Sequence, residues 1–252
     1  MNETTIVATT DLHRRFGEGV AAVDALAGVS VDIRRGEFTA IMGASGSGKS
    51  TLMHLMAGLD TPTAGSVTLD GVSLGDLDDR RLTELRRDKV GFVFQAFNLL
   101  PVLTAEENLV LPLTIAGRKP EPAWLESLVA AVGLGDRRTH RPSELSGGQQ
   151  QRGAVARALV SKPAVVFADE PTGNLDSNAS AEVLALLRRA VDDYEQTVVM
   201  VTHDAGAAAY ADRLLVLADG RVAHDGPALS TEQVIDVMKA VTTGDLNPAS
   251  TS

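Results

Sequence analysis

The sequence predicts an α/β fold with a mainly parallel sheet, an antiparallel β-subdomain at the N-terminus and an inserted α-helical subdomain. Three observations along the 252 residues indicate this organisation. Short β-rich runs separated by turns open the chain, helix-forming segments fill its middle, and short apolar runs then alternate with helical segments. Apolar strands that alternate with helices are typical of a parallel sheet covered on both faces.

The N-terminal elements are predicted from β-rich runs bounded by turn residues. We expect strands at 6–12, 25–33, 38–42 and 67–69, with a loop at 17–19. The third of these strands runs into a Gly/Ser loop, and a helix at about 49–57 follows it. This order of strand, glycine-rich loop and helix is the local feature on which the functional interpretation depends.

The middle of the chain is richer in predicted helices. Its expected elements are a helix, a strand and a second helix, at 78–87, 90–94 and 124–132. Between them, Thr104 and Glu107 have the spacing of a capping box, so a helix is expected to begin there and Pro112 to limit it.

The last part of the chain alternates strands and helices. These are expected at 164–168, 179–191, 197–202, 205–211 and 214–217. We predict a single domain at 1–244, a helical subdomain at about 97–160, and a flexible tail at 245–252.

Composition excludes several classes of function. The net charge of −10, from 23 basic and 33 acidic residues, argues against a nucleic-acid partner, which usually requires a basic stripe. The absence of cysteine removes disulfides, thiolate metal sites and cysteine nucleophiles. We expect no signal peptide and no membrane-spanning segment, because no apolar run approaches the necessary length.

The loop from Gly43 to Ser50 matches the phosphate-binding pattern G-x-x-x-x-G-K-[ST]. Its amide groups and the helix N-terminus that follows favour a bound phosphate, which Lys49 is expected to contact, while Ser50 offers a hydroxyl to Mg²⁺. A flexible Gly/Ser turn is the alternative, and the flanking strand and helix disfavour it. We therefore predict a P-loop NTPase core, with nucleotide-binding residues Gly43, Ala44, Ser45, Gly46, Ser47, Gly48, Lys49, Ser50 and Thr51.

Two carboxylates follow the predicted buried strand at 164–168. Asp169 is placed to hold the metal with Ser50, and Glu170 to orient and polarise the attacking water. The alternative is that both acids cap the end of a strand before Pro171. A phosphate loop upstream in the same chain makes the metal and general-base interpretation the better one.

His203 comes directly after another predicted strand, at 197–202. Strand ends line the ligand crevice of open α/β sheets, so this imidazole is a candidate sensor of the γ-phosphate. We assign no role to the four other histidines, which are His13, His54, His140 and His224. The predicted catalytic residues are therefore Lys49, Glu170 and His203.

A second glycine-rich segment, Leu145-Ser-Gly-Gly-Gln149, precedes an alanine-rich helix. In isolation it is simply a loop that enters a helix. It lies 97 residues after Lys49, counted to Ser146, and 23 residues before Asp169. With these motifs the chain resembles the nucleotide-binding domain of ABC transporters over almost its whole length, in particular the MacB/LolD/FtsE-like branch, which serves lipoprotein release, peptide or macrolide efflux and cell-division permeases.

The resemblance implies further roles. Gln95 is similar to the Q-loop glutamine, expected to contact nucleotide and metal, and Asp176 to the D-loop aspartate. Leu145–Gln149 is similar to the family signature, whose Ser146, Gly147, Gly148 and Gln149 act in trans on the ATP of a second copy. ATP and Mg²⁺ are the implied cofactors.

The implied assembly is a head-to-tail homodimer with an integral-membrane permease at the cytoplasmic face of the membrane. ATP is expected to close the dimer and hydrolysis to reopen it. A chromosome-structuring ATPase would need long heptad segments between Lys49 and Ser146, and a ribosome-binding ATPase a second motif set, so both remain weaker alternatives.

Two positions depart from the family pattern. Phe16 stands where the family often has a tyrosine that stacks on adenine, and a core aromatic residue is the alternative for it. Gly153 interrupts the helix after the signature, at an expected cost of about 1 kcal/mol relative to alanine.

Overall fold

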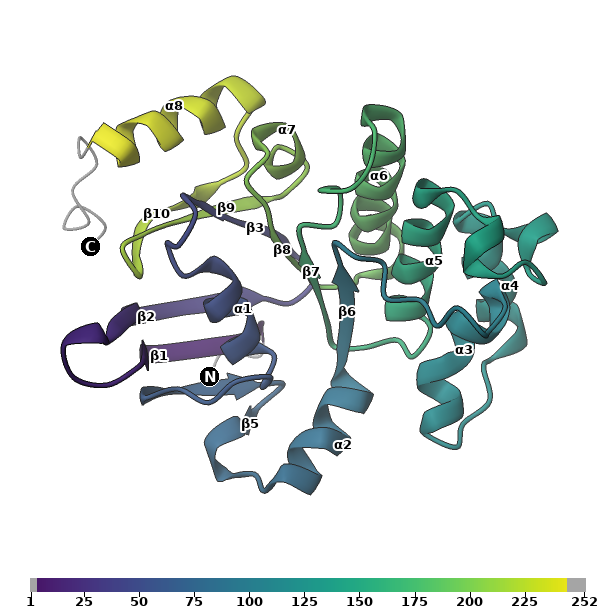
Figure 1. The fold of residues 1–252 in the computed structure, drawn as a ribbon, viewed down its shortest axis with the longest axis horizontal. Coiled ribbons are helices and arrows are strands. Elements are labelled where there is room, and N and C mark those ends of the chain that lie inside the picture. Colours follow the sequence, from purple (N-terminus) through teal and green to yellow (C-terminus); the bar gives the residue numbers. More distant parts are fainter. Residues whose placement is uncertain (1–3, 244–252) are drawn as a thin grey trace.

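The computed structural model describes residues 4–243 and contains two sheets with helices around them (Figure 1). The predicted tail at 245–252 lies outside the described residues. The first sheet is antiparallel, with strand order β2-β1-β4-β5. Its strands are β1 (Thr5–Phe16), β2 (Val23–Arg34), β4 (Ala64–Leu69) and β5 (Val72–Ser73).

The second sheet has six strands in the order β10-β9-β3-β8-β7-β6. All neighbours are parallel except β10, which runs antiparallel to β9. The strands are β3 (Phe38–Gly43), β6 (Val90–Phe94), β7 (Val165–Asp169), β8 (Val198–Val201), β9 (Arg213–Ala218) and β10 (Arg221–Pro227). The predicted fold class, with a mainly parallel sheet and a separate antiparallel sheet, is confirmed.

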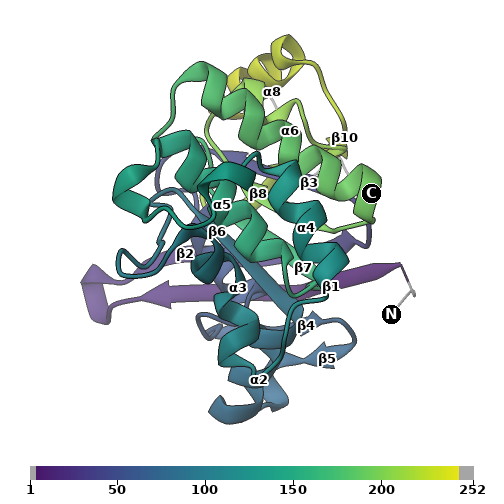
Figure 2. The same ribbon diagram turned by 90° about the vertical axis from the view of Figure 1, so that its right-hand side faces the viewer.

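The helices of the described residues fall into four groups. Helix α1 follows the glycine-rich loop, α2 precedes β6, and α3 to α5 gather beside β6, whereas α6 to α8 alternate with the later strands (Figures 1 and 2). Their bounds are α1 (Lys49–Met56), α2 (Asp79–Lys89), α3 (Ala105–Ile115), α4 (Pro122–Ala131), α5 (Gly147–Leu159), α6 (Ser177–Tyr194), α7 (Ala205–Ala208) and α8 (Thr231–Thr243). Short 3₁₀ turns occur at Gly19–Ala21, Leu74–Asp76, Gly135–Arg137 and Pro142–Glu144.

The parallel sheet separates two hydrophobic clusters. Because successive residues of a strand point to opposite faces, Phe38, Ala40 and Met42 of β3 join the cluster that contains α3 to α6, whereas Ile41 joins the other. That second cluster contains α1 and the inner face of the antiparallel sheet. Burial on both faces explains the uniformly apolar strands of the sequence and fixes their ends rigidly.

The capping box is confirmed, but the predicted effect of Pro112 is wrong. Thr104 accepts from the backbone of Glu107, and the Glu107 carboxylate accepts from the backbone of Thr104. Helix α3 continues through Pro112 to Ile115. Proline removes only its own N–H donor, and its carbonyl still accepts from Ala116 at 3.1 Å.

Several smaller elements differ from expectation. Helix α7 ends at Ala208, three residues before the predicted end, and β5, β10 and α8 were not predicted.

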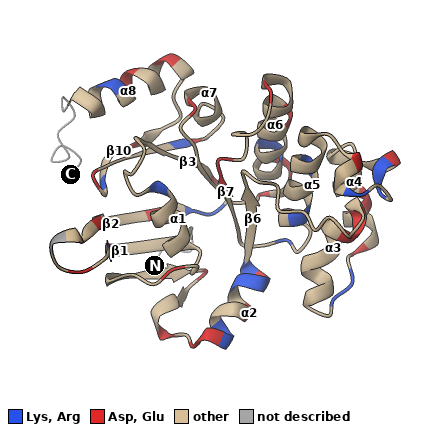
Figure 3. Ribbon diagram, in the orientation of Figure 1, with Lys and Arg blue, Asp and Glu red and all other residues tan. Residues whose placement is uncertain are grey.

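In the described part of the chain, no helix combines the length and apolar character needed to cross a membrane. Lysine and arginine are interspersed with aspartate and glutamate along α2 (Figure 3).

Candidate functional site

The glycine-rich loop connects the end of β3 to the start of α1. Gly43 has φ 147° and Gly48, the N-cap of α1, has φ 100°. A Cβ atom on Gly43 would lie 2.3 Å from the Leu217 carbonyl oxygen, and one on Gly48 would lie 2.3 Å from that of Ala25. Both positions therefore require glycine for conformation and for space.

Lys49 folds back over this loop. Its Nζ atom donates to the carbonyl oxygens of Gly43 and Ala44, at 2.9 Å each. Burial lowers the pKa of the Lys49 ammonium, and the nearby Glu170 and Asp169 carboxylates oppose that shift. The cation thus stands at the mouth of the loop, where a phosphate can replace the two carbonyl oxygens as its partner.

Ser50 and Asp169 meet although 119 positions separate them in the sequence. The Ser50 hydroxyl donates to Oδ1 of Asp169 at 3.4 Å. Burial raises the pKa of the Asp169 carboxyl, while His54, the Ser50 hydrogen bond and Lys49 act in the opposite direction. A hydroxyl and a carboxylate side by side are hard oxygen donors of the kind Mg²⁺ prefers.

This donor set fits a metal that is shared with a ligand. Within residues 4–243, no three histidine, aspartate or glutamate side chains converge in a way that could hold a metal ion. Mg²⁺ is commonly bound by one or two protein oxygens together with substrate phosphates and water. The Ser50–Asp169 pair beside the phosphate loop matches that mode.

Glu170 and His203 form a second pair at the ends of adjacent strands. Nδ1 of His203 lies 2.8 Å from Oε1 of Glu170. The Glu170 side chain is 20% exposed and that of His203 is 74% exposed, so the imidazole covers a largely enclosed carboxylate. Glu170 has a left-handed backbone, with φ 46°, and its N–H donates to Val201.

Gln95 lies at the same edge of the sheet, because the preceding Phe94 pairs with Asp169 in the β6–β7 register. Its Nε2 atom donates to Oδ1 of Asn174 at 3.1 Å, and Nδ2 of Asn174 donates to the Gln95 carbonyl at 3.1 Å. Among the described residues, its side chain therefore bonds to the segment before Asp176 and not to Ser50 or Asp169.

The remaining candidates from the signature segment, Leu145–Gln149, and from the D-loop begin helices. Ser146 and Gln149 form a capping box at the start of α5, and Asp176 caps α6 by accepting from Ala179 at 2.9 Å. Helix α5 packs on one face of the parallel sheet and α1 on the other. The signature segment and the phosphate loop of one chain are therefore attached to opposite sides of the sheet.

Phe16 ends β1 and is 44% exposed, so it is not a core aromatic residue. The Arg14 guanidinium stacks on its ring, 4.5 Å from the centroid.

Gly153 faces Leu134, whose Cδ1 would lie 3.5 Å from an added Cβ. The structure gives no reason for glycine rather than alanine there.

The contacts that hold the Gln95 loop carry no motif in the sequence. Arg157 of α5 is half-buried and donates to the carbonyls of Phe97 and Asn98, which both have φ 52°. Burial lowers the pKa of this guanidinium. No local pattern marks Arg157, because its partners lie about sixty positions away.

Comparison with known families agrees with this geometry. The family described as "ABC transporter" matches residues 26–173, which include the phosphate loop, the signature segment and Asp169–Glu170. The chain belongs to the ABC transporter family. As an ABC cassette it is an ATP-binding and ATP-hydrolysing domain.

Individual relatives cover the chain to different extents. It is 46% identical over 224 residues to the lipoprotein-releasing system ATP-binding protein LolD of Geobacter metallireducens, covering 88% of this chain and 100% of that protein. It is 46% identical over 237 residues to the macrolide export ATP-binding/permease protein MacB of Marinobacter nauticus, covering 93% of this chain. The chain spans only 37% of the length of that MacB protein.

A solved structure is similar over most of the chain. The dimeric post-hydrolysis structure of the ATP-binding cassette MJ0796 with ADP and Pi has a TM-score of 0.80 and 40% identity. The match covers 89% of this chain and 100% of that one. Between Lys49 and Ser146, a stretch that the structure describes completely, no helix exceeds 11 residues, which leaves no room for the long arms of a chromosome-structuring ATPase.

Proposed function

We propose that this chain is the ATPase subunit of a MacB- or LolD-like transport machine. ATP with Mg²⁺ closes a head-to-tail homodimer, hydrolysis reopens it, and the movement drives an integral-membrane permease at the cytoplasmic face of the membrane. The observation that carries the proposal is the convergence of Lys49, Ser50, Asp169, Glu170 and His203 at one edge of the sheet.

Each residue has one task in this mechanism. The loop amides and Lys49 hold the phosphates, and Lys49 exchanges its two carbonyl partners for phosphate oxygens. Ser50 and Asp169 would hold Mg²⁺, which neutralises charge on the phosphates when it is bound. Glu170 orients the attacking water and accepts its proton, and His203 hydrogen-bonds the γ-phosphate from beside Glu170.

A second copy completes the site. Because α5 and α1 lie on opposite faces of the sheet, the signature segment does not cover the phosphate loop of its own chain. In a head-to-tail dimer, the signature of each copy closes over ATP held by the other. The two similar cassette structures of MJ0796 are described as dimers, which supports this arrangement.

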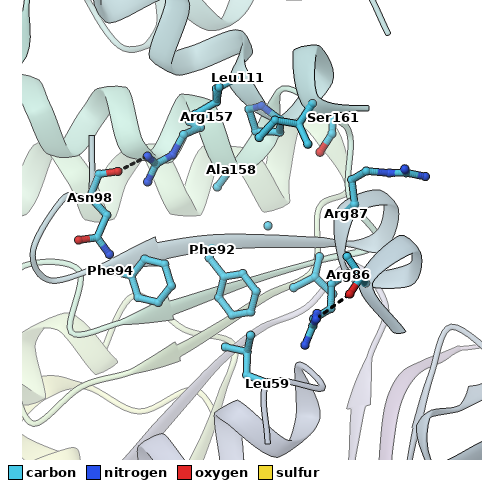
Figure 4. Close-up of a pocket in the computed structure, with 15 residues that line it drawn as sticks. Leu59, Arg86, Arg87, Phe92, Phe94, Asn98, Leu111, Arg157, Ala158 and Ser161 are labelled. Carbon is cyan, nitrogen blue, oxygen red and sulfur yellow. Dashed lines mark hydrogen bonds between the residues drawn. The ribbon is translucent and has the colours of Figure 1, made fainter. Parts of the chain in front are cut away.

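This chain carries a groove that suits docking of the permease. A groove of about 490 Å³ opens between α2, β6, α3 and α5 (Figure 4). Its floor carries Phe92 and Phe94, stacked at 5.5 Å, and its rim includes Ile115, which is 70% exposed. An exposed apolar groove of this kind fits an amphipathic segment of a partner.

The groove also touches the machinery of hydrolysis. Phe94 directly precedes Gln95, and Arg157 at the groove wall bonds to the Gln95 loop (Figure 4). A helix of the permease seated here would therefore press on the segment that follows β6. The proposed mechanical coupling between permease and ATPase therefore acts at the junction of α5 and β6.

Mixing two inactive variants tests the composite site. Lys49→Ala removes the phosphate contact, and Ser146→Ala removes the signature hydroxyl. Neither should hydrolyse ATP alone, but their mixture should recover activity, because a mixed dimer retains one intact site. Absence of recovery, when a tag pull-down shows that mixed dimers have formed, would argue against the proposed two-chain site.

A further inference from the structure

Gln151 is a fully buried polar residue on α5, two positions after the signature segment. Its Nε2 atom donates to the carbonyl oxygen of Phe94 at 3.0 Å and to that of Pro171 at 2.5 Å. An amide nitrogen has two N–H groups, so these two bonds use its whole donor capacity. The side chain therefore links two backbone segments and not a wider polar network.

The two carbonyls belong to the segments that carry the predicted chemistry. Phe94 is the last residue of β6 and precedes Gln95, while Pro171 follows Glu170. Phe94 also pairs with Asp169 at the end of the β6–β7 ladder. The Gln151 amide thus joins the end of β6 to the turn that follows β7.

This position matters because the backbone of Glu170 is strained. A φ of 46° is sparsely populated by residues other than glycine. Three hydrogen bonds hold this turn. The Glu170 N–H donates to the Val201 carbonyl at 2.9 Å, and the Gly173 N–H donates to the Glu170 carbonyl at 3.0 Å. The third runs from the Gln151 side chain to the Pro171 carbonyl. Of these three bonds, the one from Gln151 connects the turn to α5.

We infer that Gln151 is a positioning residue for ATP hydrolysis. It holds the turn of Glu170 and the strand end before Gln95 at a fixed distance from the signature helix. Movement of α5 on dimer closure is thereby transmitted to the carboxylate that orients water. The inference rests on the proposed function, since it requires that Glu170 act on the attacking water.

The chain offers a matched control for the loss of such a bond. Gln196 is also buried, and its Nε2 atom donates to the Pro163 carbonyl at 2.9 Å. Pro163 precedes β7, so this bond stands at the start of the strand whose end carries Asp169. Gln196→Met removes the same chemical interaction without touching a predicted site residue.

The experiment measures kcat, KM and ATP affinity for the full chain and its variants. Gln151→Met keeps the length of the side chain and loses both donors. We expect kcat to fall about 10- to 100-fold, because a displacement of roughly 1 Å at the reacting groups has effects of that size. The Kd for a fluorescent ATP analogue should stay near the wild-type value, since the phosphate loop is unchanged.

Two further variants complete the test. Gln196→Met should lower the melting temperature and leave kcat near wild type. If Gln151→Met does not fold, Gln151→Asn retains the amide on a shorter side chain and gives the same readout. Unchanged kcat, or parallel losses of kcat and ATP affinity, would overturn the positioning role. A wild-type chain without Mg²⁺-dependent hydrolysis would instead overturn the proposed function, and this inference with it.

Discussion

The Nδ1 atom of His203 lies 2.8 Å from Oε1 of Glu170, at the ends of two adjacent parallel strands. The pair places an exposed imidazole over a largely enclosed carboxylate. One oxygen of the carboxylate is thereby in contact with His203.

Glu170→Gln tests the general base. The amide is isosteric but cannot accept a proton from water, so we expect the rate of ATP hydrolysis to fall about 100-fold or more. ATP binding should persist, and the closed dimer should accumulate in size-exclusion chromatography with ATP and Mg²⁺. Hydrolysis at the wild-type rate would contradict the role of Glu170.

Asp169→Asn tests whether the ionised Asp169 carboxylate lowers the stability of the fold without nucleotide. Burial raises the pKa of the Asp169 carboxyl, so the folded chain binds its proton more tightly than the unfolded chain does. Stability from this group therefore falls as pH rises, and the ionised form destabilises the apo fold at neutral pH. We expect the variant to be at least as stable as wild type at neutral pH, with the advantage shrinking as the pH falls toward the usual titration range of aspartate.

Melting curves without nucleotide, recorded over this pH range, give the result. The same variant should lose Mg²⁺-dependent hydrolysis, because an amide is a poorer ligand for the metal. A lower melting temperature than wild type at high pH, with no dependence on acidification, would show that the carboxylate is not destabilising.

Phe16→Ala tests adenine stacking. Phe16 is exposed at the end of β1, and removal of a stacking ring costs about 1–3 kcal/mol per base. We expect the KM for ATP to rise about tenfold or more, while Phe16→Tyr stays near wild type. Equal ATP affinity in all three proteins would exclude Phe16 from the nucleotide site.

Gly153→Ala should stabilise the fold. Glycine within a helix costs about 1 kcal/mol relative to alanine, and an added Cβ would meet Leu134 at an ordinary contact distance of 3.5 Å. The melting temperature should rise by about 2–4 °C for a chain of this size, with unchanged ATPase activity. A loss of activity would reveal a functional reason for the glycine.

Ile115→Glu tests the docking groove. A charge at this exposed rim position should reduce recovery of the chain with membranes of the producing cell about tenfold or more if the position is a hot spot. The ATPase activity of the isolated chain should not change. Val72→Glu, at an exposed apolar position outside the groove, is the control. Equal membrane recovery of both variants would exclude the groove as the permease site.

Local patterns predicted much of this molecule. The strand at 90–94 was located residue for residue, and the capping box of Thr104 and Glu107 formed as expected. Both depend on side chains close in sequence. Pro112 was misjudged because the packing of Leu109 and Leu113 in the core on either side of it compensates for one missing hydrogen bond.

Contacts between residues far apart in the sequence could not be predicted from local patterns. The resemblance implies a nucleotide and metal contact for Gln95, and the folded chain also bonds its amide to Asn174, a partner that no motif indicated. Gln151 and Arg157 reach carbonyls 57 and 60 positions away. A backbone carbonyl leaves no signature in the sequence, so no motif could identify either residue.

The motifs and their spacing were sufficient to identify the family, the phosphate loop and the candidate residues for hydrolysis. Each motif is a short segment whose chemistry depends on neighbours in the chain. Folding established that Ser50 meets Asp169, that Glu170 meets His203, and that the signature segment lies on the far side of the sheet from its own phosphate loop. These relationships depend on strand order and on which face of the sheet each helix covers, which are properties of the packed chain.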